Sequence, residues 1–288
     1  MLVILMAKPK AVILTGFGIN SEQETAWAFE KAGAIPSLVH FNDLAGRPST
    51  LEEYQILVLS GGWSFADNIQ SGRVLANKFK FNLQKEFSKF VDEDKAVLGI
   101  CNGFQILAQL GAIPGWENNK RRVTLMHNRQ GRFEDRWVRL RTESCVSPFA
   151  QKLNPIITLP IRHGEGQVVI DEKETLEKLI ENRQIVFRYA GIDGLAAKEY
   201  PDNPNGSADS IAGLCNEQGN VVGLMPHPEC HIRYLQNPHW TANPPYKLPN
   251  DIFSKTLKAF GFARKSIADF GNCMPFFESI VNFSKKKA

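Results

Sequence analysis

Short apolar runs alternate with helix-like segments over the first 110 residues, and this alternation is the strongest constraint on the fold. The runs predict buried strands because they are aliphatic and β-branched, and turn residues follow most of them. The predicted strands lie at 11–15, 37–41, 54–59 and 96–100. The predicted helices lie at 21–32, 78–91 and 102–110, and Ser21 and Glu24 have the spacing of a capping box. Alternation of this kind implies a parallel sheet with helices on both faces.

The middle of the chain has a different pattern. Residues 123–141 alternate polar and apolar side chains, which favours antiparallel strands. Further short strands are predicted at 168–170, 185–189, 211–215 and 221–225. We therefore expect an α/β fold with a mostly parallel open sheet flanked by helices and added antiparallel strands. The sequence after residue 231 is irregular except for a predicted helix at 251–260, so we expect one domain at 9–235 and a C-terminal extension at 236–288, packed on or beside it.

Composition limits the partners and compartments to consider. The 288 residues carry a formal net charge of +4, an excess too small to predict nucleic-acid binding. No segment approaches the roughly 20 apolar residues of a membrane span, and the apolar start is too short for a signal peptide. The five cysteines have no regular spacing, which argues against a disulfide framework or a metal site. We expect a cytoplasmic protein with reduced thiols, no nucleic-acid or membrane partner and no bound metal.

Cys101 lies at the junction between the strand predicted at 96–100 and the helix that follows. Gly99 and Gly103 flank it in the G-x-C-x-G spacing of a nucleophile elbow. A side chain at either glycine would collide with neighbouring backbone in so tight a turn. The helix N-terminus supplies unpaired N–H groups and a partial positive charge, which favour a thiolate and can bind an oxyanion. A lone cysteine is more often a buried structural residue, but this context favours a nucleophile.

A cysteine nucleophile needs a base, and the segment after the strand predicted at 221–225 offers one. His227 and Glu229 lie two residues apart in an extended segment stiffened by two prolines, so their side chains point the same way. His227 could face Cys101 while Glu229 fixes the orientation and tautomer of its ring. The alternative is a stiff surface loop. The order Cys, His, Glu, each at a strand end, favours a catalytic triad.

Several stretches match a known family. The segments SGG (60–62), GICNGFQ (99–105) and PHPE (226–229) together resemble the class I, or triad, glutamine amidotransferases. Five stretches are similar to one branch, the glutaminase component of phosphoribosylformylglycinamidine synthase in purine biosynthesis. They are GGWSFAD (61–67), NRQGRFEDRWV (128–138), RHGEG (162–166), YPDNPNGS (200–207) and MPHPE (225–229). The resemblance covers about residues 9–235 and implies a flavodoxin-like fold.

The resemblance implies that the chain hydrolyses glutamine and delivers ammonia. Cys101 would attack the side-chain carboxamide, His227 would transfer protons and Glu229 would orient His227. Backbone N–H groups would meet the oxyanion, and residues on the same loops would hold the substrate. The expected oxyanion donors are Asn102 and Gly62 or Trp63, and the expected substrate contacts are Gln105, Gly61 and Ser64.

The sequence contains no phosphate-binding glycine loop. The resemblance therefore implies that ATP and magnesium bind to a separate synthetase subunit, with or without a small bridging subunit, and that this chain itself binds no cofactor. The aromatic and basic segment 233–283 is one candidate for the surface that contacts the partner. Two alternatives remain open: a stand-alone hydrolase with a Cys-His-Glu triad, and a non-catalytic regulatory subunit.

The sequence departs from the family pattern at two places near the expected site. The family usually has a glycine where this chain has Ala66, and an arginine where it has Cys230. Neither change affects the triad, although Ala66 could alter the loop lining the pocket. His163, in RHGEG, could lie near the site or belong to a structural turn made by its two neighbouring glycines.

Overall fold

The main sheet joins a parallel half to an antiparallel half. The computed structural model describes residues 7–117, 119–242 and 270–287, and within them nine strands form one sheet in the order β2-β1-β3-β4-β11-β10-β9-β6-β7. The parallel strands are β2 (Ile35–His40), β1 (Lys10–Thr15), β3 (Ile56–Leu59), β4 (Ala96–Ile100) and β11 (Val221–Leu224). The antiparallel strands are β10 (Ile211–Cys215), β9 (Ile185–Ala190), β6 (Glu134–Thr142) and β7 (Ile156–His163).

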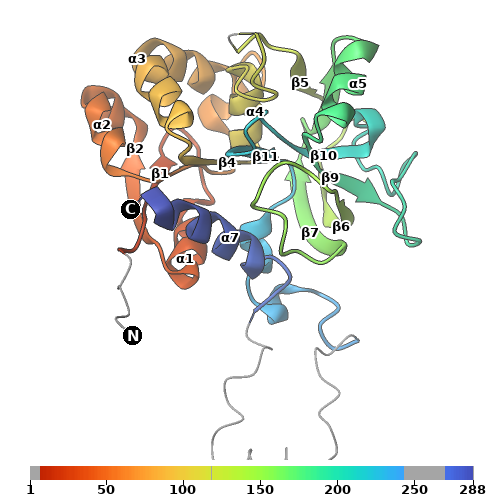
Figure 1. The fold of residues 1–288 in the computed structure, drawn as a ribbon. Coiled ribbons are helices and arrows are strands. Elements are labelled where there is room, and N and C mark those ends of the chain that lie inside the picture. The colour runs from red at the N-terminus through yellow and green to blue at the C-terminus, as the bar shows by residue number, and fades with distance from the viewer. Residues whose placement is uncertain (1–6, 118, 243–269, 288) are drawn as a thin grey trace, which may run out of the picture.

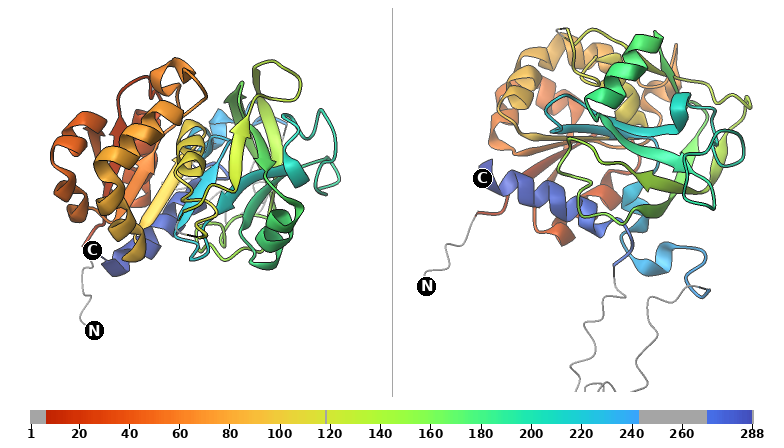
Figure 2. Two further views of the ribbon diagram at one scale, coloured as in Figure 1. Left: turned by 90° about the horizontal axis from the view of Figure 1, so that it is seen from above. Right: turned by 45° about the vertical axis from the view of Figure 1, so that its right-hand side comes forward.

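Helices cover both faces of the parallel half. Figures 1 and 2 show α2, α3 and α4 on one side of the sheet and α1 and α7 on the other. Their bounds are α1 (Glu22–Ala32), α2 (Phe41–Gly46), α3 (Arg73–Asp92), α4 (Asn102–Gln109) and α7 (Met274–Ser284). Every residue of β3, β4 and β11 is buried, as expected for strands covered on both faces. The α/β fold class predicted from the sequence is confirmed.

Apolar side chains at helical spacing pack α3 into the hydrophobic core. The stripe recurs every three or four residues, which places its members on one face of the helix. It consists of Leu75, Phe79, Leu83, Phe87 and Phe90, all buried. The helix begins at Arg73, five residues before the predicted start, because Gly72 takes a left-handed conformation with φ of 74° and turns the chain there.

The C-terminal helix α7 is part of the core. The ring of Phe277 meets Phe29 of α1 edge to face, 5.1 Å between centroids, and Phe276 packs against Phe187 of β9 at 5.9 Å. This part of the segment 233–283 therefore covers the sheet. The helix predicted at 251–260 lies outside the described residues.

The predicted antiparallel region at 123–141 contains two separate strands. β5 (Val123–Met126) pairs with β8 (Gln167–Ile170) in a small second sheet, and β6 joins the main one. Two elements of the structure were not predicted from the sequence, β7 and α5 (Lys173–Glu181). In the described ranges, no helix is both long and apolar enough to cross a membrane.

The strand order determines where functional residues can meet. β3, β4 and β11 are parallel neighbours, so their carboxyl ends lie at one edge of the sheet. The loop beginning at Ser60, the turn at Cys101 and the segment from Met225 to Glu229 follow these three ends. An open α/β sheet binds ligands at this edge, so residues from these three segments can form a site there.

Candidate active site

The turn at Cys101 has the strained geometry of a nucleophile elbow. Cys101 has φ of 50° and ψ of −104°, a conformation that costs an L-residue roughly 1–3 kcal/mol. A Cβ on Gly99 would lie 2.7 Å from the Gly103 backbone, and one on Gly103 would collide with the Leu59 carbonyl. The Cys101 N–H donates to the Leu224 carbonyl of β11 at 2.8 Å. The predicted reason for the two glycines is confirmed, and the turn is anchored to the strand that precedes His227.

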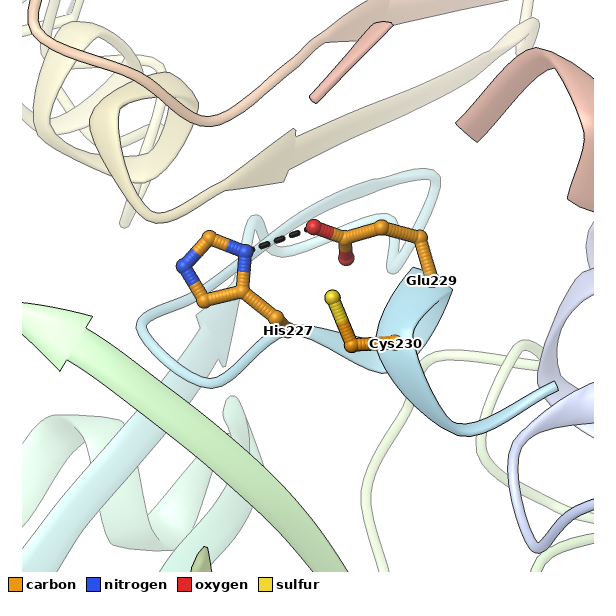
Figure 3. Close-up of side chains that lie close together, drawn as sticks. All are labelled: His227, Glu229 and Cys230. Atoms are coloured by element: carbon orange, nitrogen blue, oxygen red, sulfur yellow. Dashed lines mark hydrogen bonds and ion pairs between the residues drawn. The ribbon is translucent and has the colours of Figure 1, made fainter. Parts of the chain in front are cut away.

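His227 is held by a fully buried carboxylate. Its Nδ1 lies 2.6 Å from Glu229 Oε1 (Figure 3), and Glu229 is 0% exposed. Because a carboxylate can only accept, Nδ1 carries the proton and Nε2 is the atom available for chemistry. No hydrogen-bond partner for His227 Nε2 exists among the described residues. The backbone N–H of His227 donates to the Pro160 carbonyl at 2.9 Å, which fixes the segment against β7.

The charges around His227 favour its protonated form. Burial of the ring opposes protonation, but the carboxylate of Glu229 and the thiolate form of Cys101 outweigh it and raise the pKa of His227 above its ordinary value. Cys101 and His227 line the same cavity, where they can act as an acid–base pair. The Cys101 sulfur also lies 3.9 Å from the Arg162 carbonyl. The structure thus brings together the three residues predicted as a triad.

The loop at residues 61–63 presents one backbone donor at the site. The Trp63 N–H already donates to the Gly18 carbonyl at 2.9 Å, so in this conformation it is engaged elsewhere. Within the described residues the Gly62 N–H has no acceptor, and the Asn102 N–H lies at the start of α4, where helical N–H groups lack partners. Of the predicted oxyanion donors, Gly62 and Asn102 are the two with available N–H groups.

Gly61 lets the triad base approach the loop closely. A Cβ on Gly61 would lie 2.8 Å from Cε1 of His227. The Gly61 N–H donates to Ser21 Oγ at 2.9 Å. Ser21 makes no side-chain bond to its own helix, so the predicted capping box is wrong. The Ser21 hydroxyl instead fixes the loop of the active site, a contact across 40 residues that local spacing cannot indicate.

Of the residues predicted as substrate contacts, Gln105 makes its side-chain hydrogen bonds within the protein, whereas the Ser64 hydroxyl has no partner among the described residues. Gln105 Nε2 donates to the Glu165 carbonyl at 2.6 Å, and its Oε1 accepts from Asn102 Nδ2 at 2.9 Å. The Ser64 N–H donates to Asn102 Oδ1 at 3.4 Å. These bonds tie the 61–64 loop, α4 and the RHGEG segment together. Gln105 and Ser64 thus help to fix the loop beside the cavity, and their contact with the substrate stays a prediction.

A cavity of about 290 Å³ opens over the triad. Cys101, His227 and Glu229 line it, with Gly62 and Trp63 of the loop. Its wall also carries charged side chains that the sequence analysis did not assign to the site: Glu24, Asp135 and Arg162. Asp135 and Arg162 lie within the family-like stretches 128–138 and 162–166, which was the available signal. These charges suit a small zwitterion such as an amino acid.

His163 supports the turn next to the site. Asn128 Nδ2 donates to the Arg132 and His163 carbonyls, so Asn128 Oδ1 must be the group facing the His163 ring. His163 Nδ1, 3.1 Å away, therefore donates to that oxygen. Burial, with the charge of His227, lowers the pKa of His163 to about 3, so the ring is neutral. These bonds support the structural alternative for His163.

The loop after the cavity holds Ala66 in a conformation that favours glycine. Phe65, Ala66 and Asp67 have consecutive φ values of 56°, 54° and 54°. A left-handed conformation costs a residue with a Cβ roughly 1–2 kcal/mol, and glycine avoids this cost. Phe65 offsets part of it by stacking on Phe17, with 4.3 Å between ring centroids. Ala66 changes the strain of the loop and leaves the triad intact.

Comparison with known proteins agrees with this site. The CobB/CobQ-like glutamine amidotransferase domain family matches residues 8–265. A relative named phosphoribosylformylglycinamidine synthase subunit PurQ, from Methanococcus maripaludis strain C7, is 40% identical over 273 residues, 93% of this chain and 97% of that protein. The subunit of the same name from Treponema denticola is 41% identical over 240 residues, 78% of this chain and 89% of that protein.

Solved structures give the same result. A chain of PurLQS from Thermotoga maritima superposes with a TM-score of 0.67 at 28% identity, covering 96% of this chain and 99% of that chain. A glutamine amidotransferase from the same organism, 15% identical with a TM-score of 0.53 over 97% of this chain and 99% of that one, shares the fold. The resemblance drawn from the motifs is confirmed. The chain belongs to the CobB/CobQ-like glutamine amidotransferase family and, within it, to the PurQ subunits of phosphoribosylformylglycinamidine synthase.

Proposed function

We propose that this chain is the glutaminase subunit of phosphoribosylformylglycinamidine synthase. It hydrolyses glutamine through a thioester on Cys101 and passes ammonia to a separate synthetase subunit. That subunit uses ATP to convert formylglycinamide ribonucleotide to formylglycinamidine ribonucleotide. The observation that carries the proposal is the Cys101–His227–Glu229 arrangement in one cavity, in a chain about 40% identical to PurQ subunits.

The first half of the reaction makes the thioester. The Cys101 thiolate attacks the side-chain carbonyl carbon of glutamine, and the oxyanion accepts hydrogen bonds from the Gly62 and Asn102 N–H groups. His227 Nε2–H gives its proton to the leaving nitrogen, and ammonia departs as the carbonyl re-forms. The raised pKa of His227 supports this role, because the base is already protonated when the thiolate attacks.

The second half regenerates the enzyme. The neutral ring of His227 takes a proton from water, and the oxygen of that water attacks the thioester carbon. The same oxyanion donors act again. Collapse breaks the carbon–sulfur bond, releasing glutamate and Cys101 thiolate. Throughout, Glu229 keeps the proton on Nδ1, so Nε2 remains the atom that exchanges protons with the substrate.

The charges on the cavity wall fit the two ends of glutamine. In the proposal, Arg162 binds the α-carboxylate, while Glu24 and Asp135 bind the α-ammonium group. Nε of Arg162 lies 3.7 Å from Oδ1 of Asp135, so a positive and a negative group are adjacent in the cavity wall. In the proposal, glutamine binds in this small cavity, and ATP and magnesium bind to the synthetase.

Exposed aromatic rings next to the cavity support a partner surface there. Trp63 and Phe133 line the cavity, lie 6.1 Å apart between ring centroids and are 50% and 48% exposed. Large aromatic side chains are enriched where proteins bind one another. We propose that the synthetase contacts this rim, and a small bridging subunit is an optional third component of the complex.

Glutamine turnover by the isolated chain is expected to be roughly 10²–10³-fold slower than turnover by the assembled complex. In the proposal, a loaded synthetase aligns the Gly62 peptide at the oxyanion, and losing one such donor has this effect on rate. Glycine permits the required peptide rotation, and Gly62 already has φ of 146°. The measurement is ammonia release by the chain alone and with the synthetase, ATP and ribonucleotide.

Comparable rates in the two assays would favour the alternative of a stand-alone hydrolase. The regulatory alternative predicts no ammonia release in either assay. It is disfavoured because a triad with a buried orienting carboxylate and an unpartnered Nε2 has no evident use in a protein that only binds glutamine.

A further inference from the structure

The thiol of Cys230 lies close to His227 and Glu229 of the triad. The ligand atoms of His227, Glu229 and Cys230 all lie within 4.8 Å of one another. Figure 3 shows the Cys230 sulfur beside the carboxylate, near the oxygen that does not bond to the histidine. Cys230 also lines the cavity over the triad.

The second oxygen of Glu229 lacks a partner. Glu229 is 0% exposed, its Oε1 bonds to His227, and its Oε2 has no hydrogen-bond partner in the described part of the chain. A buried carboxylate oxygen left unsatisfied is costly, so it marks a place where a proton donor or a cation would be stabilised. This oxygen faces the Cys230 thiol.

We infer that His227, Glu229 and Cys230 form an inhibitory site for a thiophilic divalent cation of the Zn²⁺ class. Imidazole nitrogen, carboxylate oxygen and thiolate sulfur are the ligands that zinc takes, and three of them leave a fourth position for water from the cavity. The irregular spacing of the cysteines predicted no bound metal. This cluster needs one cysteine only, and the fold supplies the other two ligands.

Binding replaces two protons. One leaves the Cys230 thiol and the other leaves the Nδ1–Oε1 hydrogen bond, and both pass to solvent through the cavity. The cavity wall carries the carboxylates of Glu24 and Asp135 as well as Glu229, which attract a cation. The guanidinium of Arg162, 3.8 Å from the Cys230 sulfur, opposes it, but this side chain is 52% exposed and can turn into solvent.

Occupation of the site disables the triad. A metal on Nδ1 takes the place of the proton that Glu229 holds there. Nε2 of the neutral ring then carries the remaining proton and cannot accept another. His227 can no longer act as the base that activates water, and glutamine hydrolysis stops until the metal leaves.

Co²⁺ absorption tests the site without requiring activity. Co²⁺ bound to a thiolate gives a charge-transfer band, so we expect the full chain to show this band and Cys101→Ala to retain it. Cys230→Ser should lose the band, and Cys145→Ser, which removes a thiol elsewhere, should keep it. Absence of the band from the unmodified chain would overturn the inference. So would its loss in Cys101→Ala together with its retention in Cys230→Ser.

Zinc inhibition gives the second readout. We expect Zn²⁺ to inhibit glutamine hydrolysis by the complex, a chelator to restore it, and Cys230→Ser to raise the half-inhibitory concentration by at least ~10–100-fold, the effect of losing even an outer-shell partner. Each variant is compared with its own metal-free rate. An unchanged half-inhibitory concentration in Cys230→Ser would contradict the site. Because the cobalt spectrum does not depend on turnover, failure of this inference and failure of the proposed function are distinguishable.

Discussion

Replacing Cys101 with alanine is expected to abolish glutamine-dependent synthesis by the assembled complex, while synthesis from added ammonium salt continues. Removal of a triad nucleophile costs on the order of 10⁶ in kcat. The thiolate is needed only to release ammonia, and the acceptor site belongs to the synthetase. Alanine should preserve the fold, because it meets the same strain at φ of 50° and the contact of the Cys101 sulfur with the Arg162 carbonyl is long, at 3.9 Å.

The matched control for this variant is Cys145→Ala. Cys145 is a partly buried thiol whose sulfur bonds to the Ser147 carbonyl, away from the triad cavity. The complex that carries Cys145→Ala should still synthesise product from glutamine and from ammonium salt. If ammonium salt fails to support synthesis by the folded Cys101→Ala complex, the proposed division between glutaminase and synthetase is wrong.

His227→Asn should slow thioester formation far more than Glu229→Gln. His227 moves the protons itself, and losing such a base costs on the order of 10⁶, whereas losing the orienting carboxylate costs on the order of 10⁴. Glutamine at position 229 keeps the size of the side chain and can still bond to Nδ1. It lacks the negative charge that raises the pKa of His227. The measurement is single-turnover formation of the acylated enzyme.

Equal losses in the two variants would count against these roles. Circular dichroism of each variant controls for folding, since Glu229 is fully buried. A Glu229→Gln variant slower than His227→Asn would show that the carboxylate takes part in proton transfer.

The parallel half of the sheet could be predicted because each strand is a continuous apolar run. The strand at 96–100 is buried on both faces, and its sequence, AVLGI, records this directly. Cys101 could be predicted for a related reason: two glycines at fixed offsets are needed by the turn itself, and they collide with backbone when given a Cβ.

The antiparallel half was harder to predict because its signals depend on tertiary position. β7 contains Pro160, which argues against a strand in general. It is tolerated because β7 is the last strand in the sheet order, and the Pro160 carbonyl accepts the N–H of His227. Nothing in the local sequence of α7 indicates that the helix is buried, because its burial depends on contact with Phe29 of α1.

The charged residues of the cavity wall also could not be predicted from the sequence. Glu24, Asp135 and Arg162 come from α1, β6 and β7, and only the fold brings them to one cavity. The local sequence also does not indicate the orientation of the 61–63 loop. A hydrogen bond from Trp63 to Gly18 decides that Gly62, and not Trp63, has the available N–H.

The central claim is that the sulfur of Cys101 attacks glutamine, and covalent labelling tests it most directly. The reagent is a glutamine analogue with a diazoketone in place of the carboxamide, which alkylates the nucleophile that attacks it. Peptide mass spectrometry of the inactivated complex should place the label on Cys101 in proportion to lost glutaminase activity, with excess glutamine protecting it. Label on Cys145, Cys215, Cys230 or Cys273, or full inactivation with Cys101 unmodified, would contradict the account.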